Sequence, residues 1–170
     1  MGDPRDEKIV EWQLGRKITN MRRVAFRCPH GYPVVIESFP IKDGKPFPTL
    51  YWLTCPHLKK EVSKLEAQGY IKKFEEKLER ERELQQRMKK AHIEIIKKRA
   101  ELLPKDHPFH ELLIKVGSGG IRNFTKLKCL HLHLADYLAG VNNPIGEMVW
   151  NLVERKFCEE ILCKSGEARK

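Results

Sequence analysis

Three cysteines of this chain each precede a histidine by two positions, which brings a thiol and an imidazole together three times. The motifs are Cys28-Pro29-His30, Cys55-Pro56-His57 and Cys129-Leu130-His131. Thiolate sulfur and imidazole nitrogen are common ligands of protein-bound zinc, and thiolates also hold iron–sulfur clusters. We therefore predict that the three thiols converge on one zinc ion or one iron–sulfur cluster.

A further ligand must come from another position in the sequence. A helix predicted over residues 125–139 would place Cys129, His133 and Asp136 on one face, at i, i+4 and i+7. His131 would project from a different face of the same helix. The predicted metal ligands are Cys28, Cys55 and Cys129, with His131 or His133 as the fourth ligand or as a hydrogen-bond partner of a ligand.

Two other interpretations of the cysteines stay open at this point. Cys55 lies where a helix should begin, with Pro56 at the first helical position, and a helix N-terminus lowers the pKa of a thiol. A cysteine-dependent enzyme would use Cys55 or Cys129 as its nucleophile, beside a nearby histidine. The simplest alternative is that all three cysteines are small buried apolar side chains. The absence of a C-x₂-C pair makes the metal signal less specific and keeps this alternative open.

The elements that position these residues are typical of an α+β fold. Three segments rich in Val, Ile, Phe, Tyr and Trp predict a small antiparallel sheet, with strands at residues 24–27, 33–41 and 49–54. Asp43-Gly44 is a turn signal, and Pro46 and Pro48 after it predict a loop longer than the minimal hairpin. Helices are predicted at 56–68, 125–139 and 144–163, together with one long charged helix at 70–103.

The length of 170 residues fits one domain. We predict an N-terminal arm or helix at residues 1–23, a single α+β domain at 24–163 that includes the long helix, and a polar tail at 164–170. Residues 117–120, Gly-Ser-Gly-Gly, predict a flexible joint because they lack the Lys-Ser/Thr that a phosphate-binding loop requires.

Charge points to a second class of function. The chain has 33 Lys and Arg against 23 Asp and Glu, a net charge of +10, and most of the excess lies on the predicted helix 70–103. A basic helix of this kind is a candidate binding module for nucleic acid, another polyanion or a protein partner. No apolar run is long enough for a signal peptide or a membrane span, so we predict a cytoplasmic protein. The oligomeric state is left open.

Four segments carry a family resemblance: RCPHGYPVVIESFP, PFPTLYWLTCPHL, VSKLEAQGY and KCLHLHLADYLAGVNNPIG. Together they resemble an uncharacterised bacterial family, domain of unknown function number five hundred and one, over residues 24–150. The resemblance implies that Cys28, Cys55, Cys129 and His131 belong to the motifs of the family, and it implies no established activity. Some members are encoded near a cell-division coiled-coil protein, so a cell-division partner is one candidate for the basic helix.

Overall fold

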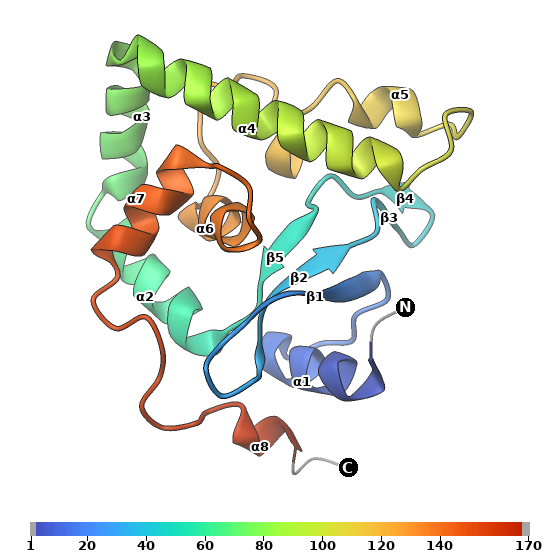
Figure 1. Ribbon diagram of the computed structural model, residues 1–170, viewed down its shortest axis with the longest axis vertical. Helices are drawn as coiled ribbons and strands as arrows, with labels where there is room; N and C mark the ends of the chain where they lie inside the picture. Colours follow the sequence, from blue (N-terminus) through green and yellow to red (C-terminus); the bar gives the residue numbers. More distant parts are fainter. Residues whose placement is uncertain (1–2, 168–170) are drawn as a thin grey trace.

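The centre of the fold is a three-stranded antiparallel sheet with the strand order β1–β2–β5, in a computed structural model that describes residues 3–167 (Figure 1). The strands are β1 (Met21–Arg27), β2 (Pro33–Ser38) and β5 (Tyr51–Leu53). All six residues of β2 are buried, as expected for the middle strand of a sheet covered on both faces. The predicted α+β class and the three-stranded antiparallel sheet are confirmed.

A two-residue hairpin lies between β2 and β5 and corrects one prediction. Strands β3 (Ile41–Lys42) and β4 (Lys45–Pro46) are joined directly by Asp43 and Gly44. Both turn residues have positive φ, 51° and 74°, which is the conformation of a type I′ turn. The proline at position 46 does not lengthen the loop because it ends a short strand, where a missing amide hydrogen costs little.

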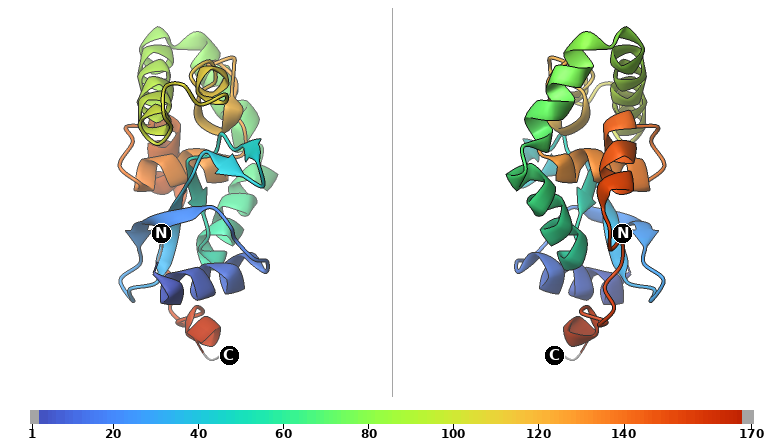
Figure 2. Two further views of the ribbon diagram at one scale, coloured as in Figure 1. Left: turned by 90° about the vertical axis from the view of Figure 1, so that its right-hand side faces the viewer. Right: turned by 90° about the vertical axis from the view of Figure 1, so that its left-hand side faces the viewer.

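Helices cover the two faces of the sheet. The face that carries Ile36 is covered by α1 (Pro4–Leu14), where Val10 joins Met21 and Ile36 in one cluster. The opposite face packs Val35 and Leu53 into the main core with α2 (Pro56–Ala67), α6 (Leu130–Leu138) and α7 (Pro144–Leu152). The short α8 (Lys164–Glu167) lies beside α1, at the end of the molecule opposite α4 (Figure 2).

The predicted long helix is wrong, because it is broken into α3 (Tyr70–Arg80) and α4 (Arg82–Glu101). Glu81 between them is extended, with φ −104° and ψ 107°, and the two helices meet at a sharp angle (Figure 1). Leu78 and Leu84 are both buried. On one continuous helix, residues six positions apart would point about 120° away from each other. The break turns both leucines toward the core.

Two later helices are shorter than predicted. The helix expected at 125–139 begins only at Leu130, so Cys129 is its N-cap and does not share a face with His133. The helix expected at 144–163 ends at Leu152, and residues 153–163 are irregular. No helix within residues 3–167 is long and apolar enough to cross a membrane.

The predicted flexible joint at residues 117–120 is instead a packed turn. It follows the short α5 (His110–Leu113) and forms the 3-10 turn η1 (Ser118–Gly120). Ser118 is buried, and a Cβ at Gly117 would lie 2.3 Å from Nδ1 of His92. The glycine at 117 is therefore required by close packing against α4 and does not act as a hinge.

Candidate functional site

The N-terminus of α6 meets one face of α2, and the contact is built around the imidazole of His131. Its Nε2 lies 3.0 Å from the carbonyl oxygen of Lys59 and 3.2 Å from Oγ of Ser63. Its Nδ1 lies 3.5 Å from Oε1 of Glu66. Lys59, Ser63 and Glu66 are at i, i+4 and i+7, so they share one face of α2.

These contacts determine which ring nitrogen carries the hydrogen in the neutral imidazole. A carbonyl oxygen can only accept, so the bond to Lys59 places the hydrogen of His131 on Nε2. In the neutral ring, Nδ1 is then the free base. The thiol of Cys129 lies beside the same imidazole, and each of the two groups shifts the pKa of the other. His131 is therefore a base next to the thiol of Cys129.

The pKa of the Cys129 thiol is lowered and the pKa of the His131 imidazole is raised. Partial desolvation would raise the pKa of the Cys129 thiol, but the His131 hydrogen bond, the Leu132 amide and the His131 charge outweigh it and lower that pKa. Desolvation would lower the pKa of His131, but its bonds to Cys129 and Lys59 and the charge of Glu66 raise it. Both shifts favour a thiolate–imidazolium pair at a helix N-terminus.

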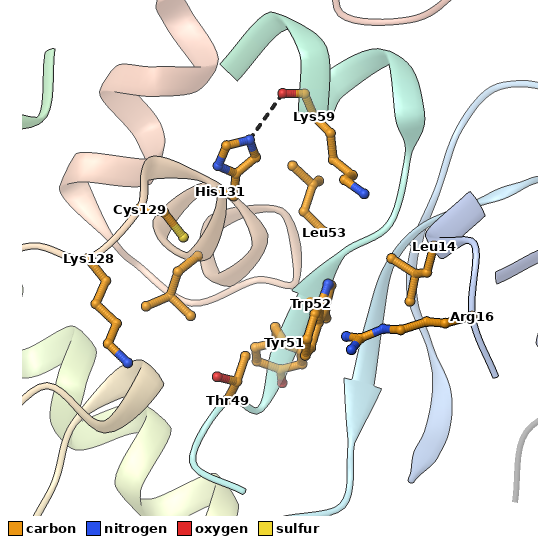
Figure 3. Close-up of a pocket in the computed structure, with 11 residues that line it drawn as sticks. Leu14, Arg16, Thr49, Tyr51, Trp52, Leu53, Lys59, Lys128, Cys129 and His131 are labelled. Atoms are coloured by element: carbon orange, nitrogen blue, oxygen red, sulfur yellow. Dashed lines mark hydrogen bonds between the residues drawn. The ribbon is translucent and has the colours of Figure 1, made fainter. Parts of the chain in front are cut away.

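A pocket of about 530 Å³ opens over this pair, and we call it the thiol pocket (Figure 3). Cys129 is an exposed residue. The lining residues come from α1 and the turn after it, from β5 and the residue Thr49 before it, and from α2 and the start of α6: Leu14, Arg16, Thr49, Tyr51, Trp52, Leu53, Lys59, Lys128, Cys129, His131 and Leu132. A nucleophilic thiol and its base thus face a space large enough for a small substrate.

The charge around the thiol pocket has one sign. Arg16, Lys59 and Lys128 line it, and none of the lining residues is acidic. Lys128 donates to the carbonyl oxygen of Gly119 at 2.5 Å, and the Arg16 guanidinium lies over the Trp52 ring, 4.9 Å from its centroid. Within residues 3–167, neither Arg16 nor Lys59 forms an ion pair. The pocket is therefore suited to a substrate with an acidic or otherwise electron-rich group.

The five predicted metal ligands do not form one group in the described chain. Among residues 3–167, no set of three or more His, Cys, Asp or Glu side chains is arranged to hold a metal ion. Of the five, Cys129 and His131 are brought together at the thiol pocket, whereas Cys28 and Cys55 lie in a different part of the core. His133 is fully buried on another face of α6, where its Nδ1 lies 3.1 Å from Nδ2 of Asn143.

Cys55 is the N-cap of α2, with Pro56 at the first helical position, as predicted. The predicted lowering of its pKa is wrong. Burial raises the pKa of the Cys55 thiol to about 11, although the amides of His57 and Leu58 act in the opposite direction. In this buried cysteine, desolvation outweighs the helix N-terminus, so Cys55 does not have the character of a nucleophile.

Cys28 and Cys55 lie instead near the two cysteines of the irregular C-terminal segment. Cys28 packs against the main core, which includes Cys55, and against the smaller cluster that contains Cys163. Burial is the main cause of the raised pKa of Cys163, and the nearby thiols of Cys28 and Cys158 add to it. Cys158 and Cys163 add in the same way to the raised pKa of Cys55. We call these residues the four-cysteine region: Cys28, Cys55, Cys158 and Cys163.

A separate buried polar network connects α4, η1 and α6. Ser118 donates to Oδ2 of Asp136 at 2.5 Å, and its backbone amide donates to Nδ1 of His92 at 3.0 Å. Arg99 is 1 % exposed and donates to four carbonyl oxygens around it, those of Pro48, Leu113, Val116 and Gly117. The network does not line the thiol pocket, and it fixes the turn that supports Lys128.

Sequence reasoning singled out Cys129 and His131 but missed the face of α2 that completes their site. Glu66 accepts a hydrogen bond from the Leu130 amide at 2.8 Å and so caps α6 from another helix. The spacing of Lys59, Ser63 and Glu66 was the available signal. A polar stripe on an otherwise amphipathic helix is also typical of plain solvent exposure, so the spacing alone does not distinguish the two.

Comparison with known proteins identifies a family but no activity. A family model described as "Protein of unknown function (DUF501)" matches residues 24–151, which span β1 to nearly the end of α7. Neither the curated proteins nor the solved structures gave a match. The matched range includes every residue of the Cys129–His131–Glu66 contact and stops before Cys158 and Cys163.

Proposed function

The chain belongs to this family of proteins of unknown function, and we propose that it is a cysteine-dependent enzyme whose active site is the thiol pocket. The observation that carries the proposal is that Cys129 and His131 line the same pocket two residues apart, with the pKa of the thiol lowered and that of the imidazole raised. A thiolate beside an oriented imidazolium is the arrangement of a nucleophile and its acid–base partner. Glu66 orients the imidazole and stabilises its charged form.

The reaction that suits these groups is acyl transfer at a carbonyl carbon. The Cys129 sulfur attacks the carbonyl and forms a C–S bond, while the bond to the leaving group breaks. His131 donates its Nδ1 proton to the leaving group. Water or an amine then attacks the thioester, losing a proton to His131, and the thiolate is released. The basic residues on the rim favour a substrate that carries negative charge near its reacting carbonyl.

Acylation of a single cysteine tests this proposal. We expect p-nitrophenyl acetate to release a burst of nitrophenolate equal to one acetyl group per chain, with the acetyl group found on Cys129 by mass spectrometry. Cys129→Ser should abolish the burst, and His131→Ala should slow it by about 100-fold or more. Cys158→Ser is the matched control and should leave it unchanged. The proposal fails if Cys129 is acylated no faster than Cys158.

A second candidate function is metal or iron–sulfur binding, now with a different set of ligands. The observation that favours it is the four-cysteine region, in which Cys28 packs against the clusters of both Cys55 and Cys163. In the described structure these four side chains are not arranged to hold a metal ion, so binding would require the irregular segment 153–163, which carries Cys158 and Cys163, to rearrange. Four thiolates suit tetrahedral zinc or a [4Fe–4S] cluster, and binding would release the thiol protons.

Metal analysis separates this candidate from the first. The protein would be purified without oxygen, and zinc, iron and the visible spectrum would be measured. Cys28→Ser and Cys163→Ser should each lose the metal, whereas Cys129→Ser should keep it. Metal-free protein that folds and unfolds cooperatively would remove the candidate. Binding of a polyanion or a protein partner by the charged helices α3 and α4, and a cytoplasmic location, stay predictions.

A further inference from the structure

The thiol pocket has a reacting end and a far end, which lie on different elements (Figure 3). At the reacting end, Cys129 caps α6 and Lys128 precedes it, with the Lys128 ammonium already bound to the carbonyl oxygen of Gly119. At the far end, Leu14 is the last residue of α1 and Arg16 lies in the turn after it. A ligand that reacts at Cys129 and fills the pocket must therefore extend toward α1.

Two cations that line the pocket have no acidic partner in the described chain. The Arg16 guanidinium lies 4.9 Å from the centroid of the Trp52 ring, and a guanidinium held over an aromatic ring keeps N–H donors for a second partner. Lys59 is half-buried, and Figure 3 shows its side chain extending from α2 past Leu53, away from Cys129. Within residues 3–167, neither cation forms an ion pair, so both can bind an acidic group of a ligand.

The surface between the thiol and these cations is largely apolar. Leu14 and Trp52 are half-buried, so each keeps surface that a ligand can cover. Leu53 and Leu132 also line the pocket and are buried, at 3 % and 6 % exposed. Each methylene group that leaves water for such a surface strengthens binding, by a factor of up to about four when it is fully buried. The pocket therefore favours an aliphatic chain between its two polar ends.

We propose that the substrate of the thiol pocket is an acyl donor whose acyl group is an aliphatic chain ending in an acidic group. The carbonyl carbon lies at Cys129, the chain covers Leu14 and Trp52, and the acidic group pairs with Arg16 and Lys59. This arrangement places the negative charge that the pocket favours at the end of the acyl group. The inference rests on the proposed function, because it names the acyl group that Cys129 accepts.

The test compares three p-nitrophenyl esters of equal chain length that differ only at the last carbon. Mono-p-nitrophenyl adipate ends in a carboxylate, p-nitrophenyl hexanoate in a methyl group, and p-nitrophenyl 6-aminohexanoate in an ammonium group. Acylation joins the carbonyl carbon of each ester to the Cys129 sulfur, and p-nitrophenolate leaves with the electron pair of the broken C–O bond. Each rate is divided by the rate of the same ester with glutathione, which removes differences in intrinsic reactivity.

On this scale we expect the hexanoate to acylate Cys129 about tenfold faster than the acetate, because its chain covers apolar surface. The adipate should be faster than the hexanoate by about three- to fivefold, and the aminohexanoate slower by a similar factor. Arg16→Gln and Lys59→Met should each reduce the preference for adipate over hexanoate to about twofold or less. The matched controls Lys17→Gln and Lys60→Met change exposed neighbours outside the pocket and should keep the full preference.

A binding measurement separates this inference from the catalytic proposal. Monomethyl adipate, whose ester is not activated, is titrated into Cys129→Ser, and the indole resonance of Trp52 is followed by NMR. A shift that saturates, and that needs at least threefold more ligand in Cys129→Ser with Arg16→Gln, supports the assigned acyl group even if Cys129 shows no special reactivity; only the catalytic proposal then fails. Equal rates for adipate and hexanoate, or a preference unchanged in both Arg16→Gln and Lys59→Met, overturn the inference even if p-nitrophenyl acetate acylates Cys129 selectively.

Discussion

Glu66 and His131 join α2 to α6 through both oxygens of one carboxylate. Oε1 lies 3.5 Å from Nδ1 of His131, and Oε2 accepts the Leu130 amide hydrogen at 2.8 Å. One side chain thus caps the helix that presents Cys129 and also orients the base beside it. The structural and the chemical role of Glu66 can be separated by a substitution that keeps the hydrogen bond and removes the charge.

Glu66→Gln is expected to lower the pKa of His131 without unfolding α6. The amide oxygen can still accept from Leu130, but the negative charge that favours the imidazolium is gone. NMR titration of the His131 ring protons measures the shift directly. Glu61→Gln on the same helix, where Glu61 pairs with Lys64, is the control and should leave the His131 titration unchanged. A His131 titration that is the same in Glu66→Gln and wild type would contradict the assigned role.

Alkylation of the thiols should depend on pH differently at each cysteine. Because its pKa is lowered, Cys129 should reach its maximal rate with iodoacetamide at a lower pH than a free cysteine. Cys55, with a pKa of about 11 and little exposure, should stay unmodified in the folded protein across the same range. Rates for each site follow from mass spectrometry of digests.

His131→Ala tests whether the imidazole is the cause of the lowered pKa of Cys129. Without the imidazole, the Cys129 profile should move to higher pH, because two of the three influences that lower its pKa are lost. Ser63→Ala removes a weaker contact of the same ring and should move the profile far less. An unshifted profile in His131→Ala would mean that the helix N-terminus alone activates the thiol.

The buried carboxyl group of Asp136 should make the free energy of unfolding depend on pH. Burial raises its pKa to about 7, although the Ser118 hydrogen bond and the charge of Arg99 oppose the shift. In the unfolded chain an aspartate titrates near about 3.9. Between these values the folded protein holds a proton that the unfolded chain has lost, so the contribution of Asp136 to the free energy of unfolding falls as pH rises.

Asp136→Asn stays neutral and should therefore be more stable than wild type at pH 8, by about 1–4 kcal/mol, with a smaller advantage at pH 5. Urea unfolding at the two pH values measures this. His92 and His133, whose burial lowers their pKa values to about 4 and about 3, titrate in both proteins, so their effect cancels in the comparison. Asp106→Asn at an exposed site is the control. A variant less stable than wild type at pH 8 would show that Asp136 is ionised and needed.

Local signals in the sequence predicted local structure well. Pro56 and Gly69 bound α2 as expected, and Asn143 with Pro144 begins α7 as expected, because each end is specified within a few residues. The break at Glu81 had no such signal. Its flanks are strong helix formers, and the break lets Leu84 join the main core, to which distant parts of the chain contribute.

The candidate site was likewise only partly predictable from the sequence. The spacing of Cys129 and His131 was visible in the sequence, but its interpretation as a metal-ligand pair depended on Cys28 and Cys55 lying with it. The fold separates the motifs because Cys129 is an N-cap in the pocket, whereas Cys28 lies at the β1–β2 turn. Glu66 is 65 positions from His131 and comes near only when α2 packs on α6. No pattern within one element predicts such a pair.

Gly146→Ala should weaken both the fold and the thiol pocket. In most helix interiors this substitution stabilises by about 1 kcal/mol. Here a Cβ would lie 2.1 Å from the carbonyl oxygen of His133 and 2.6 Å from Cβ of Tyr137, so α7 must move away from α6. We expect a net loss of about 1–3 kcal/mol in the free energy of unfolding. Because α6 presents Cys129, selective alkylation of that thiol should fall as well.

The control for Gly146→Ala is Asn151→Ala, which adds helix propensity on an exposed position of the same helix. It should leave the alkylation rate of Cys129 unchanged and stability equal or slightly raised. Urea unfolding and the site-specific alkylation rate are read on the same preparations. If Gly146→Ala loses stability but keeps the Cys129 rate, then Glu66 on α2, and not the α6–α7 contact, fixes the position of the thiol.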